Sequence, residues 1–144
     1  MESPEILAIN RLHPQPPYLS VIDNGGIDSE EDYNYTAVDG DCWLNASERV
    51  VATIDTFVDV TANSEDQLAA AVQLQPVSVA IEADQAGFQS YSSGVFDDTD
   101  CGTNLDHGVL VVGLESDAYI VKNSWGSSWG ENGPSLPRRP AAAC

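Results

Sequence analysis

His107 and Asn123 are two residues whose chemistry suits proton transfer. A neutral imidazole has one donor and one acceptor nitrogen. A carboxamide oxygen that accepts the ring N–H would fix the ring and leave the other nitrogen free to take a proton from a nucleophile. Trp125 could cover that hydrogen bond and keep water away from it, which strengthens it. The three residue types match the orienting half of a Cys-His-Asn site, although a lone histidine on a strand would more simply be a core residue.

Two apolar runs must position these residues, and the sequence predicts that they form a hairpin. If Gly113 faces Tyr119, then His107 faces Trp125. Asn123 is then the diagonal neighbour of His107, about 7–8 Å away on the same side of the sheet. A slip of one residue would place His107 and Asn123 on opposite faces, so the prediction depends on the register. The two predicted strands are His107–Gly113 and Tyr119–Trp125. The five residues Leu114–Ala118 connect them, which is within the usual length of a hairpin loop.

The same stretch resembles the papain-like cysteine peptidases. Leu105-Asp106-His107-Gly108 is similar to the histidine motif of that family. The segment Tyr119–Gly133 is similar to its asparagine motif, with Lys122-Asn123-Ser124-Trp125-Gly126 at the centre. Four upstream segments are also similar to segments of these enzymes and occur in the same order along the chain: Asn24–Asp28 through Tyr33 and Tyr35, Val50–Asp55, Gln75–Ala80 and Tyr91–Phe96.

The resemblance implies a role for each matching residue. His107 would be the general base and acid, Asn123 its orienting residue and Trp125 the shield over both. Three residues would bind substrate: Ala80, Leu105 and Asp106. Ala80 and Leu105 would line the pocket for the substrate side chain second from the cleaved bond. The resemblance implies a peptide or protein substrate, no cofactor and no metal. It also implies location in a lysosome or vacuole, or secretion.

The resemblance further implies an α+β fold. These residues would be mostly the C-terminal, antiparallel, barrel-like lobe of a papain-like fold, with one helix and incomplete at both ends. The expected organisation is an unmatched, proline-containing segment 1–23, a partial peptidase domain 24–133, and an unmatched tail 134–144 rich in Pro, Arg and Ala. Because prolines follow Gly133, the closing strands of the barrel are expected to be absent.

The nucleophile of such a site is missing from the sequence. In this family the His and Asn lie about 130–150 residues downstream of a C-G-[SA]-C-[WY] signature, but only 106 residues precede His107. Neither that signature nor the glutamine of the oxyanion hole is found. Since a base without its thiol forms no acyl-enzyme, the chain is expected to be inactive alone. Three alternatives stay open: one lobe of a peptidase that needs its missing N-terminal lobe, an inactive module that binds a peptide or inhibitor, or a gene-model fragment.

The three cysteines offer no substitute nucleophile. By resemblance, Cys42 and Cys101 match structural half-cystines, one paired with the missing half of the family's fold and the other with a later cysteine. Cys42 then has no visible partner, and a Cys101–Cys144 bridge is possible. Neither Cys42 nor Cys144 lies in a recognisable nucleophile context, so neither is expected to attack a substrate.

The composition limits the kinds of partner that the chain is expected to bind. The 144 residues carry 23 acidic and five basic side chains, a formal net charge of −18. Such a surface repels phosphate backbones and anionic membranes, so neither nucleic acid nor membrane is an expected partner. The acid excess indicates either a solvated surface or work in an acidic compartment. There is no signal-peptide core and no run long enough to span a bilayer, whereas two acceptor sequons suit secretory passage: Asn34-Tyr35-Thr36 and Asn45-Ala46-Ser47.

The remaining patterns predict ordinary structural elements. Gly25-Gly26 is predicted to form a turn, and alternation predicts a strand over Arg49–Val60. Ser64 and Gln67 form a capping-box pattern that would open an amphipathic helix ended by Pro76. A strand is expected at Val77–Ile81, and an aromatic turn followed by a strand at Phe88–Phe96. Asp97, Asp98 and Asp100 lack the spacing of an EF-hand and are expected to form a solvated acidic loop. Leu12–Pro17 is expected to be extended, with His13 exposed in a loop.

Overall fold

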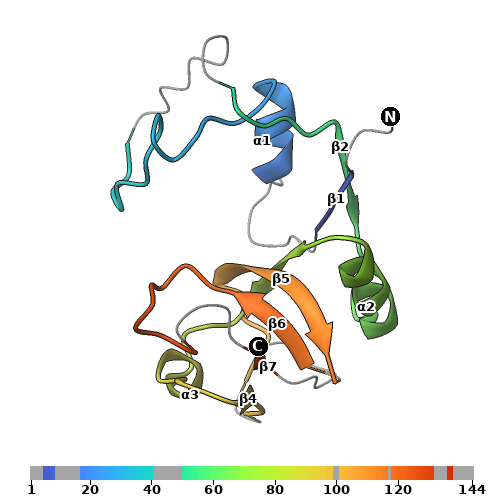
Figure 1. The fold of residues 1–144 in the computed structure, drawn as a ribbon, viewed down its shortest axis with the longest axis vertical. Helices are drawn as coiled ribbons and strands as arrows, with labels where there is room; N and C mark the ends of the chain where they lie inside the picture. Colours follow the sequence, from blue (N-terminus) through green and yellow to red (C-terminus); the bar gives the residue numbers. More distant parts are fainter. Residues whose placement is uncertain are drawn as a thin grey trace. The chain divides into compact units, whose positions relative to one another are not determined.

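The computed structural model describes residues 5–8, 17–40, 50–98, 101–116, 118–131 and 136–137. The expectations for His13, Arg49, Asp100, Cys42, Cys144 and the second sequon fall outside these residues. Figure 1 labels the helices and strands in chain order: β1 (Glu5–Ala8), α1 (Pro17–Asp23), β2 (Thr56–Asp59), α2 (Glu65–Leu74), β3 (Val77–Ile81), α3 (Ala86–Gln89), β4 (Val95–Phe96), β5 (His107–Glu115), β6 (Ala118–Lys122) and β7 (Leu136–Pro137).

The chain divides into two compact units. Unit 1 comprises Met1–Ile6 and Gln15–Phe57, and unit 2 comprises Leu7–Pro14 and Val58–Cys144. Helix α1 belongs to unit 1. The antiparallel strands β3, β5 and β6 and the helices α2 and α3 belong to unit 2, which therefore holds His107, Asn123 and the other predicted site residues.

An open sheet organises unit 2. In it β5 lies between β3 and β6, and β4 and β7 form a separate parallel pair. Strand β3 runs antiparallel to β5 from Val77 opposite Val111 to Ile81 opposite His107. Helices combined with an antiparallel sheet confirm the α+β fold class. The described strands do not close into a barrel, so the barrel-like description is too strong.

The β5–β6 hairpin, drawn in orange in Figure 1, contains a β-bulge. At its turn end Glu115 pairs with Ala118 and Gly113 with Ile120. The register then shifts between Val111 and Gly113, so that Val111 pairs with Val121. One extra residue on β5 accounts for such a shift and increases the local twist.

The predicted connection of this hairpin is therefore wrong. Pairing continues up to Glu115 and Ala118, which leaves a two-residue turn in place of the expected five-residue connection. The first turn residue, Ser116, has a φ of 46°, in the left-handed region that tight hairpin turns use. Beyond the bulge, Leu110 faces Lys122, which is the pairing that the predicted register gives at the His107 end.

Helix α2 begins and ends close to the prediction, with Ser64 and Gln75 as its caps. Its buried residues Ala69, Ala71 and Val72 lie on the face that packs on the sheet. The capping box is wrong, because the Ser64 side chain makes no capping hydrogen bond. The Gln67 side chain turns instead to the main-chain N–H of Thr61, 3.3 Å away.

The core of unit 2 is built from the inward residues of β3, β5 and β6. Val77 is fully buried (0% exposed), and Val109, Val111 and Val121 are also buried in the same cluster. Strand β3 has the predicted bounds, Val77–Ile81. Burial of apolar area at about 25 cal/mol per Å² makes this cluster the principal source of stability for the sheet.

Two strand predictions need correction. In the described part of the predicted strand Arg49–Val60, which begins at Val50, only Thr56–Asp59 forms a strand (β2), and Ala52 makes an isolated bridge to Ile27. Alternation there does not bury one face, as Val51 is 62% exposed. The tail, expected to contribute no strand, provides β7, whose Leu136 and Pro137 pair with Val95 and Phe96.

Unit 1 contains one short helix among its described residues. Helix α1 covers Pro17–Asp23, within the segment 1–23 for which the resemblance gives no counterpart in the family. The predicted turn at Gly25-Gly26 is confirmed and ends this helix. Gly25 N–H donates to Ile22 O and Gly26 N–H to Val21 O, the hydrogen-bond pattern of a Schellman motif with Gly25 left-handed at φ 73°.

Candidate active site

The bulged hairpin brings His107 and Asn123 together. His107 is the first residue of β5, and Asn123 follows the last residue of β6. Nε2 of His107 lies 2.8 Å from Oδ1 of Asn123. The predicted juxtaposition on one side of the sheet is thereby found.

The protonation of the ring follows from a second contact. The main-chain N–H of Ser124 donates to the same Oδ1 of Asn123 at 2.7 Å. An amide N–H can only donate, so the Asn123 atom at this position is the oxygen. Nε2 of His107 must then carry the proton that it donates, and Nδ1 of the neutral ring is left as the proton acceptor.

Trp125 lies against the imidazole, as the predicted register requires. The ring centroids of His107 and Trp125 are 5.0 Å apart, with 30° between the ring planes. The indole is 36% exposed. It therefore has one face toward the His107 ring while part of it still meets solvent.

An aromatic cluster supports Trp125. Phe88 and Trp129 contact it edge-on, with centroids 5.5 and 5.2 Å away. Nε1 of Trp129 donates to the main-chain oxygen of Phe88 at 3.0 Å in a buried position, which ties the loop after β6 to α3. The sequence predicts an aromatic turn and strand at Phe88–Phe96 but no part in the site for Phe88 or Trp129; in the structure Phe88 lies in helix α3. The positions of Phe88 and Trp129 in the sequence do not by themselves predict their contact with Trp125.

The three predicted substrate-binding residues lie at the same end of β3 and β5. Ala80 is buried and faces Gly108, while Leu105 is half-buried. Asp106 has an exposed side chain, but its Oδ1 accepts the main-chain N–H of Ala83 at 2.7 Å. One oxygen of this carboxylate is therefore already used within the chain.

One polar atom of the site has no partner. Nδ2 of Asn123 is buried and makes no hydrogen bond among the described residues. An unpaired buried amide donor costs about 1–3 kcal/mol. The carboxamide is thus held by its oxygen, through His107 and Ser124, and not by its nitrogen.

Cys101 is disulfide-bonded and is not a free thiol. Cys42 and Cys144 lie outside the described residues, so the pairing of Cys101 stays a prediction. Among the described residues, no group of three or more His, Cys, Asp or Glu side chains has the arrangement of a metal site. None of the described helices has the length and apolar character needed to cross a bilayer.

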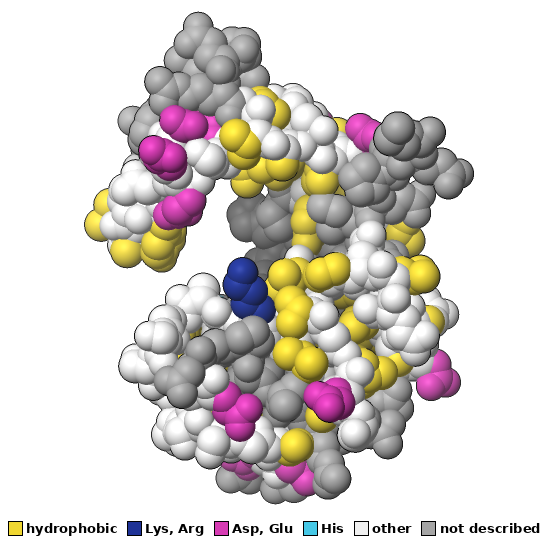
Figure 2. All heavy atoms as spheres, in the orientation of Figure 1, with side chains coloured by type: hydrophobic (Ala, Val, Ile, Leu, Met, Phe, Trp, Pro, Cys, Tyr) yellow, Lys and Arg dark blue, Asp and Glu magenta, His cyan; other side chains and the backbone are white. Residues whose placement is uncertain are grey.

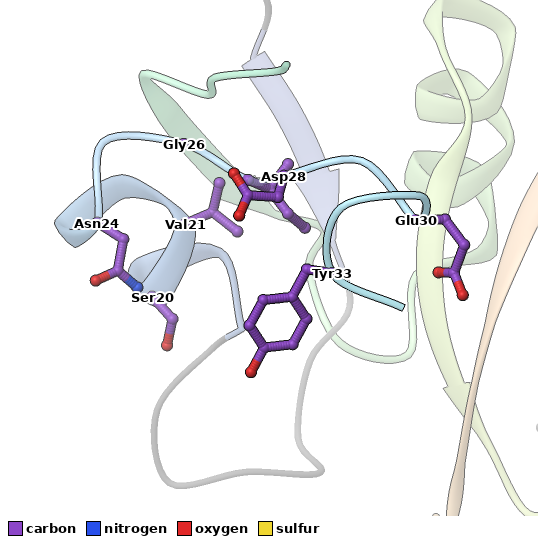
Figure 3. Close-up of a pocket in the computed structure, with 8 residues that line it drawn as sticks. Ser20, Val21, Asn24, Gly26, Asp28, Glu30 and Tyr33 are labelled. Atoms are coloured by element: carbon purple, nitrogen blue, oxygen red, sulfur yellow. The ribbon is translucent and has the colours of Figure 1, made fainter. Parts of the chain in front are cut away.

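Unit 1 contains a separate pocket of about 280 Å³ (Figure 3). Its walls come from α1 and the loop that follows, and Figure 3 shows the Asp28 carboxylate and the Tyr33 ring among them. Gly26 shapes this region, because a Cβ there would lie 2.3 Å from Val50 and 2.7 Å from the oxygen of Ala52. The residues that line this pocket include no histidine or cysteine, so they supply neither an imidazole nor a thiol.

Comparison with known proteins identifies the family of the chain. The sequence profile of the papain family cysteine proteases matches residues 13–142. The chain belongs to the papain family. Its relatives include the probable cysteine protease RD21B of Arabidopsis thaliana, 55% identical over 117 residues, and the oryzain beta chain of Oryza sativa subsp. japonica, also 55% identical over 117 residues. Each alignment covers 78% of this chain and 25% of the relative, so the chain spans about a quarter of their length.

Solved structures of papain family members share the fold. The bromelain protease of Ananas comosus, solved with the E64 inhibitor, is 37% identical with a TM-score of 0.76, covering 88% of this chain and 60% of that one. The Carica candamarcensis protease CMS1MS2, solved with E-64, is 36% identical with a TM-score of 0.75, covering 88% of this chain and 61% of that one. The family resemblance and the papain-like fold class are therefore confirmed.

Proposed function

We propose that these residues form the base-bearing part of a papain-type cysteine peptidase. The observation that supports this most directly is the 2.8 Å contact between Nε2 of His107 and Oδ1 of Asn123, which leaves Nδ1 as the acceptor. In the proposed reaction, Nδ1 takes the proton of a cysteine thiol, and the thiolate attacks the carbonyl carbon of a peptide bond. The imidazolium then gives its proton to the leaving amine as the C–N bond breaks. Water, deprotonated by the same ring, hydrolyses the thioester and regenerates the thiol.

Each of the other predicted site residues has a role in this proposal. Asn123 holds the imidazole in the productive tautomer, and Trp125 keeps solvent from their hydrogen bond. Ala80 and Leu105 form an apolar wall for the side chain second from the cleaved bond, and Asp106 beside them also binds the substrate. The reaction uses no metal and no cofactor.

The thiol in this proposal is contributed by a segment that the 144 residues do not contain, since they lack the cysteine signature of the family. The chain by itself should therefore be inert. The test mixes it with a separately expressed N-terminal lobe of a relative, such as the oryzain beta chain, under reducing conditions. A fluorogenic dipeptide with an apolar second residue is then offered at mildly acidic and at neutral pH.

We expect turnover only in the mixture, blocked by E-64 and abolished by His107→Ala. His13→Ala is the matched control and should leave turnover unchanged. Turnover by the chain alone that His107→Ala abolishes would show that a cysteine within it is the nucleophile. A mixture that binds but never cleaves would contradict the peptidase proposal.

The second candidate is a non-enzymatic module that binds a peptide, an inhibitor or a partner lobe. Several exposed large hydrophobic side chains of unit 2 favour it: Val58 is 43% exposed, Leu74 82% and Val95 46%. Figure 2 shows hydrophobic side chains gathered on part of the visible surface. Apolar surface of this kind often marks an interaction site. Calorimetry with the separate lobe distinguishes the two candidates, because binding without restored cleavage supports this one alone.

We further propose that the protein passes through an oxidising, secretory compartment. The disulfide at Cys101 suits such a compartment. One relative, 49% identical, is named a KDEL-tailed cysteine endopeptidase of Arabidopsis thaliana, and a KDEL tail is a retention signal of the endoplasmic reticulum. Within the described sequon, Asn34 and Thr36 are exposed and open to glycosylation. Expression in a secretory host should add a glycosidase-sensitive modification, and Asn34→Gln should reduce the added mass by one glycan, leaving any glycan at the second sequon.

A further inference from the structure

Glu82 is a buried carboxylate to which the proposed reaction gives no role. It follows β3 directly and is only 7% exposed, and it is the one buried charged side chain among the described residues. A buried carboxylate is costly unless hydrogen bonds satisfy it. Both of its oxygens have a partner: Oε1 accepts from Nε2 of Gln85 and Oε2 from the main-chain N–H of Asn104, each at 2.7 Å.

Gly102 leaves room for this carboxylate. A Cβ at Gly102 would lie 2.2 Å from Oε2 of Glu82 and 2.9 Å from its Cδ and Oε1. The main chain of the segment before β5 therefore lies directly against the Glu82 head group. Any side chain at position 102 would displace the carboxylate or the loop.

A second carboxylate makes the reverse connection. Oδ1 of Asp106 accepts the N–H of Ala83, and the N–H of Asp106 donates to the oxygen of Ile81 at 3.0 Å. Thus Glu82, in the segment after β3, accepts a main-chain N–H from the segment before β5. In return Asp106, in the segment before β5, accepts a main-chain N–H from the segment after β3. We call this reciprocal pair, Glu82 with Asn104 and Asp106 with Ala83, the carboxylate clasp.

The carboxylate clasp adjoins the functional end of the sheet. It lies next to the pair formed by Ile81 and His107, where β5 begins. A shift of one residue at this point would turn His107 to the other face of the sheet, away from Asn123. The loop that the clasp holds also carries Leu105, proposed above as a substrate wall.

We infer that Glu82 is a positioning residue for His107: through the carboxylate clasp it fixes the main chain entering β5 and so keeps the imidazole on Asn123. The inference rests on the proposed function in that it gives the site a further residue. Its own evidence is the geometry of the clasp, and its test needs no turnover.

The test follows the proton on Nε2 of His107 by NMR in the full chain with isotope-labelled histidine. His13→Gln identifies the resonance, because the chain has only two histidines. In the parent chain this proton should be visible and slow to exchange with solvent, since it is hydrogen-bonded to Asn123. Amides of β3, β5 and β6 report separately on whether the sheet is intact.

Glu82→Ala and Gly102→Ala should both accelerate exchange of the Nε2 proton by about tenfold or more, the factor that one lost hydrogen bond supports. The strand amides should stay protected. Glu82→Gln should retain slow exchange, because its amide oxygen can accept from Asn104 while the Gln85 side chain rotates to accept from its NH₂ group. Glu115→Ala removes an exposed carboxylate at the other end of β5 and is the matched control.

An Nε2 proton that exchanges equally slowly in Glu82→Ala would overturn the inference. Loss of protection throughout the sheet in that variant would also overturn it, because a positioning role at one end of β5 requires the rest of the sheet to survive. Failure of the separate lobe to restore cleavage bears on the proposed function and leaves these readings unaffected.

Discussion

The Oδ1 atom of Asn123 accepts two hydrogen bonds, from Nε2 of His107 at 2.8 Å and from the main-chain N–H of Ser124 at 2.7 Å. The second bond comes from the next residue along the chain, so the main chain sets the direction of the carboxamide independently of the imidazole. The imidazole therefore meets an acceptor whose orientation the main chain already fixes. This explains how a side chain beyond the end of β6 can determine the tautomer of a histidine at the start of β5.

Asn123→Ala should release the His107 ring. Loss of a hydrogen bond worth about 1.5 kcal/mol corresponds to about a tenfold fall in kcat/KM, measured in the reconstituted two-lobe enzyme. In the chain alone, the slowly exchanging Nε2 proton should disappear from the NMR spectrum. Asn34→Ala, which alters an exposed loop in unit 1, is the control and should change neither reading. A persistent Nε2 proton in Asn123→Ala would mean that another group holds the ring.

Trp125→Ala should expose the hydrogen bond between His107 and Asn123 to water. Hydrogen bonds are stronger where the local dielectric constant is low, so the Nε2 proton should exchange faster than in the parent chain. Trp125→Phe should have a smaller effect, because a smaller ring can still cover part of the imidazole. Tyr35→Ala removes an aromatic side chain that is 83% exposed and serves as the control. Equal exchange in all three variants would contradict a shielding role.

The sequence predicted the functional end of the hairpin better than its turn. Pairing of His107 with Trp125 was inferred from a five-residue connection, whereas the chain uses a two-residue turn and a bulge between Val111 and Gly113. The extra residue in β5 offsets the shift that the shorter turn introduces. Alternation alone cannot locate a bulge, because the apolar run His107–Gly113 contains no break that marks it.

The carboxylate clasp shows what the sequence could not reveal. Glu82 and Asn104 are 22 positions apart, and neither residue belongs to a motif that predicts their contact. The family resemblance predicts that Asp106 binds substrate, and the structure shows in addition a contact with Ala83. Local patterns located the strands and the histidine, while these contacts depend on how the segments after β3 and before β5 come together in the folded sheet.

Ser64→Ala tests the local rule that failed at α2. A working N-cap serine contributes about 1 kcal/mol, but the Ser64 side chain makes no such bond. We therefore expect Ser64→Ala to lower the free energy of unfolding by less than about 0.5 kcal/mol, the size of an ordinary surface substitution, as measured by urea denaturation. A loss of a full capping contribution would mean that the capping box forms in solution.

Ser116→Gly should stabilise the chain, although glycine substitutions usually destabilise. Ser116 has a φ of 46°, where a side chain costs about 1–2 kcal/mol, while the added freedom of glycine in the unfolded chain costs about 0.4–1 kcal/mol. The net expectation is a gain of about 0.5 kcal/mol in the free energy of unfolding. Ser92→Gly is the matched control, because Ser92 is exposed and is not among the residues with positive φ. It bears only the unfolded-state cost and should destabilise. If both substitutions destabilise equally in urea titrations, the left-handed turn at Ser116 is not the conformation that closes the hairpin.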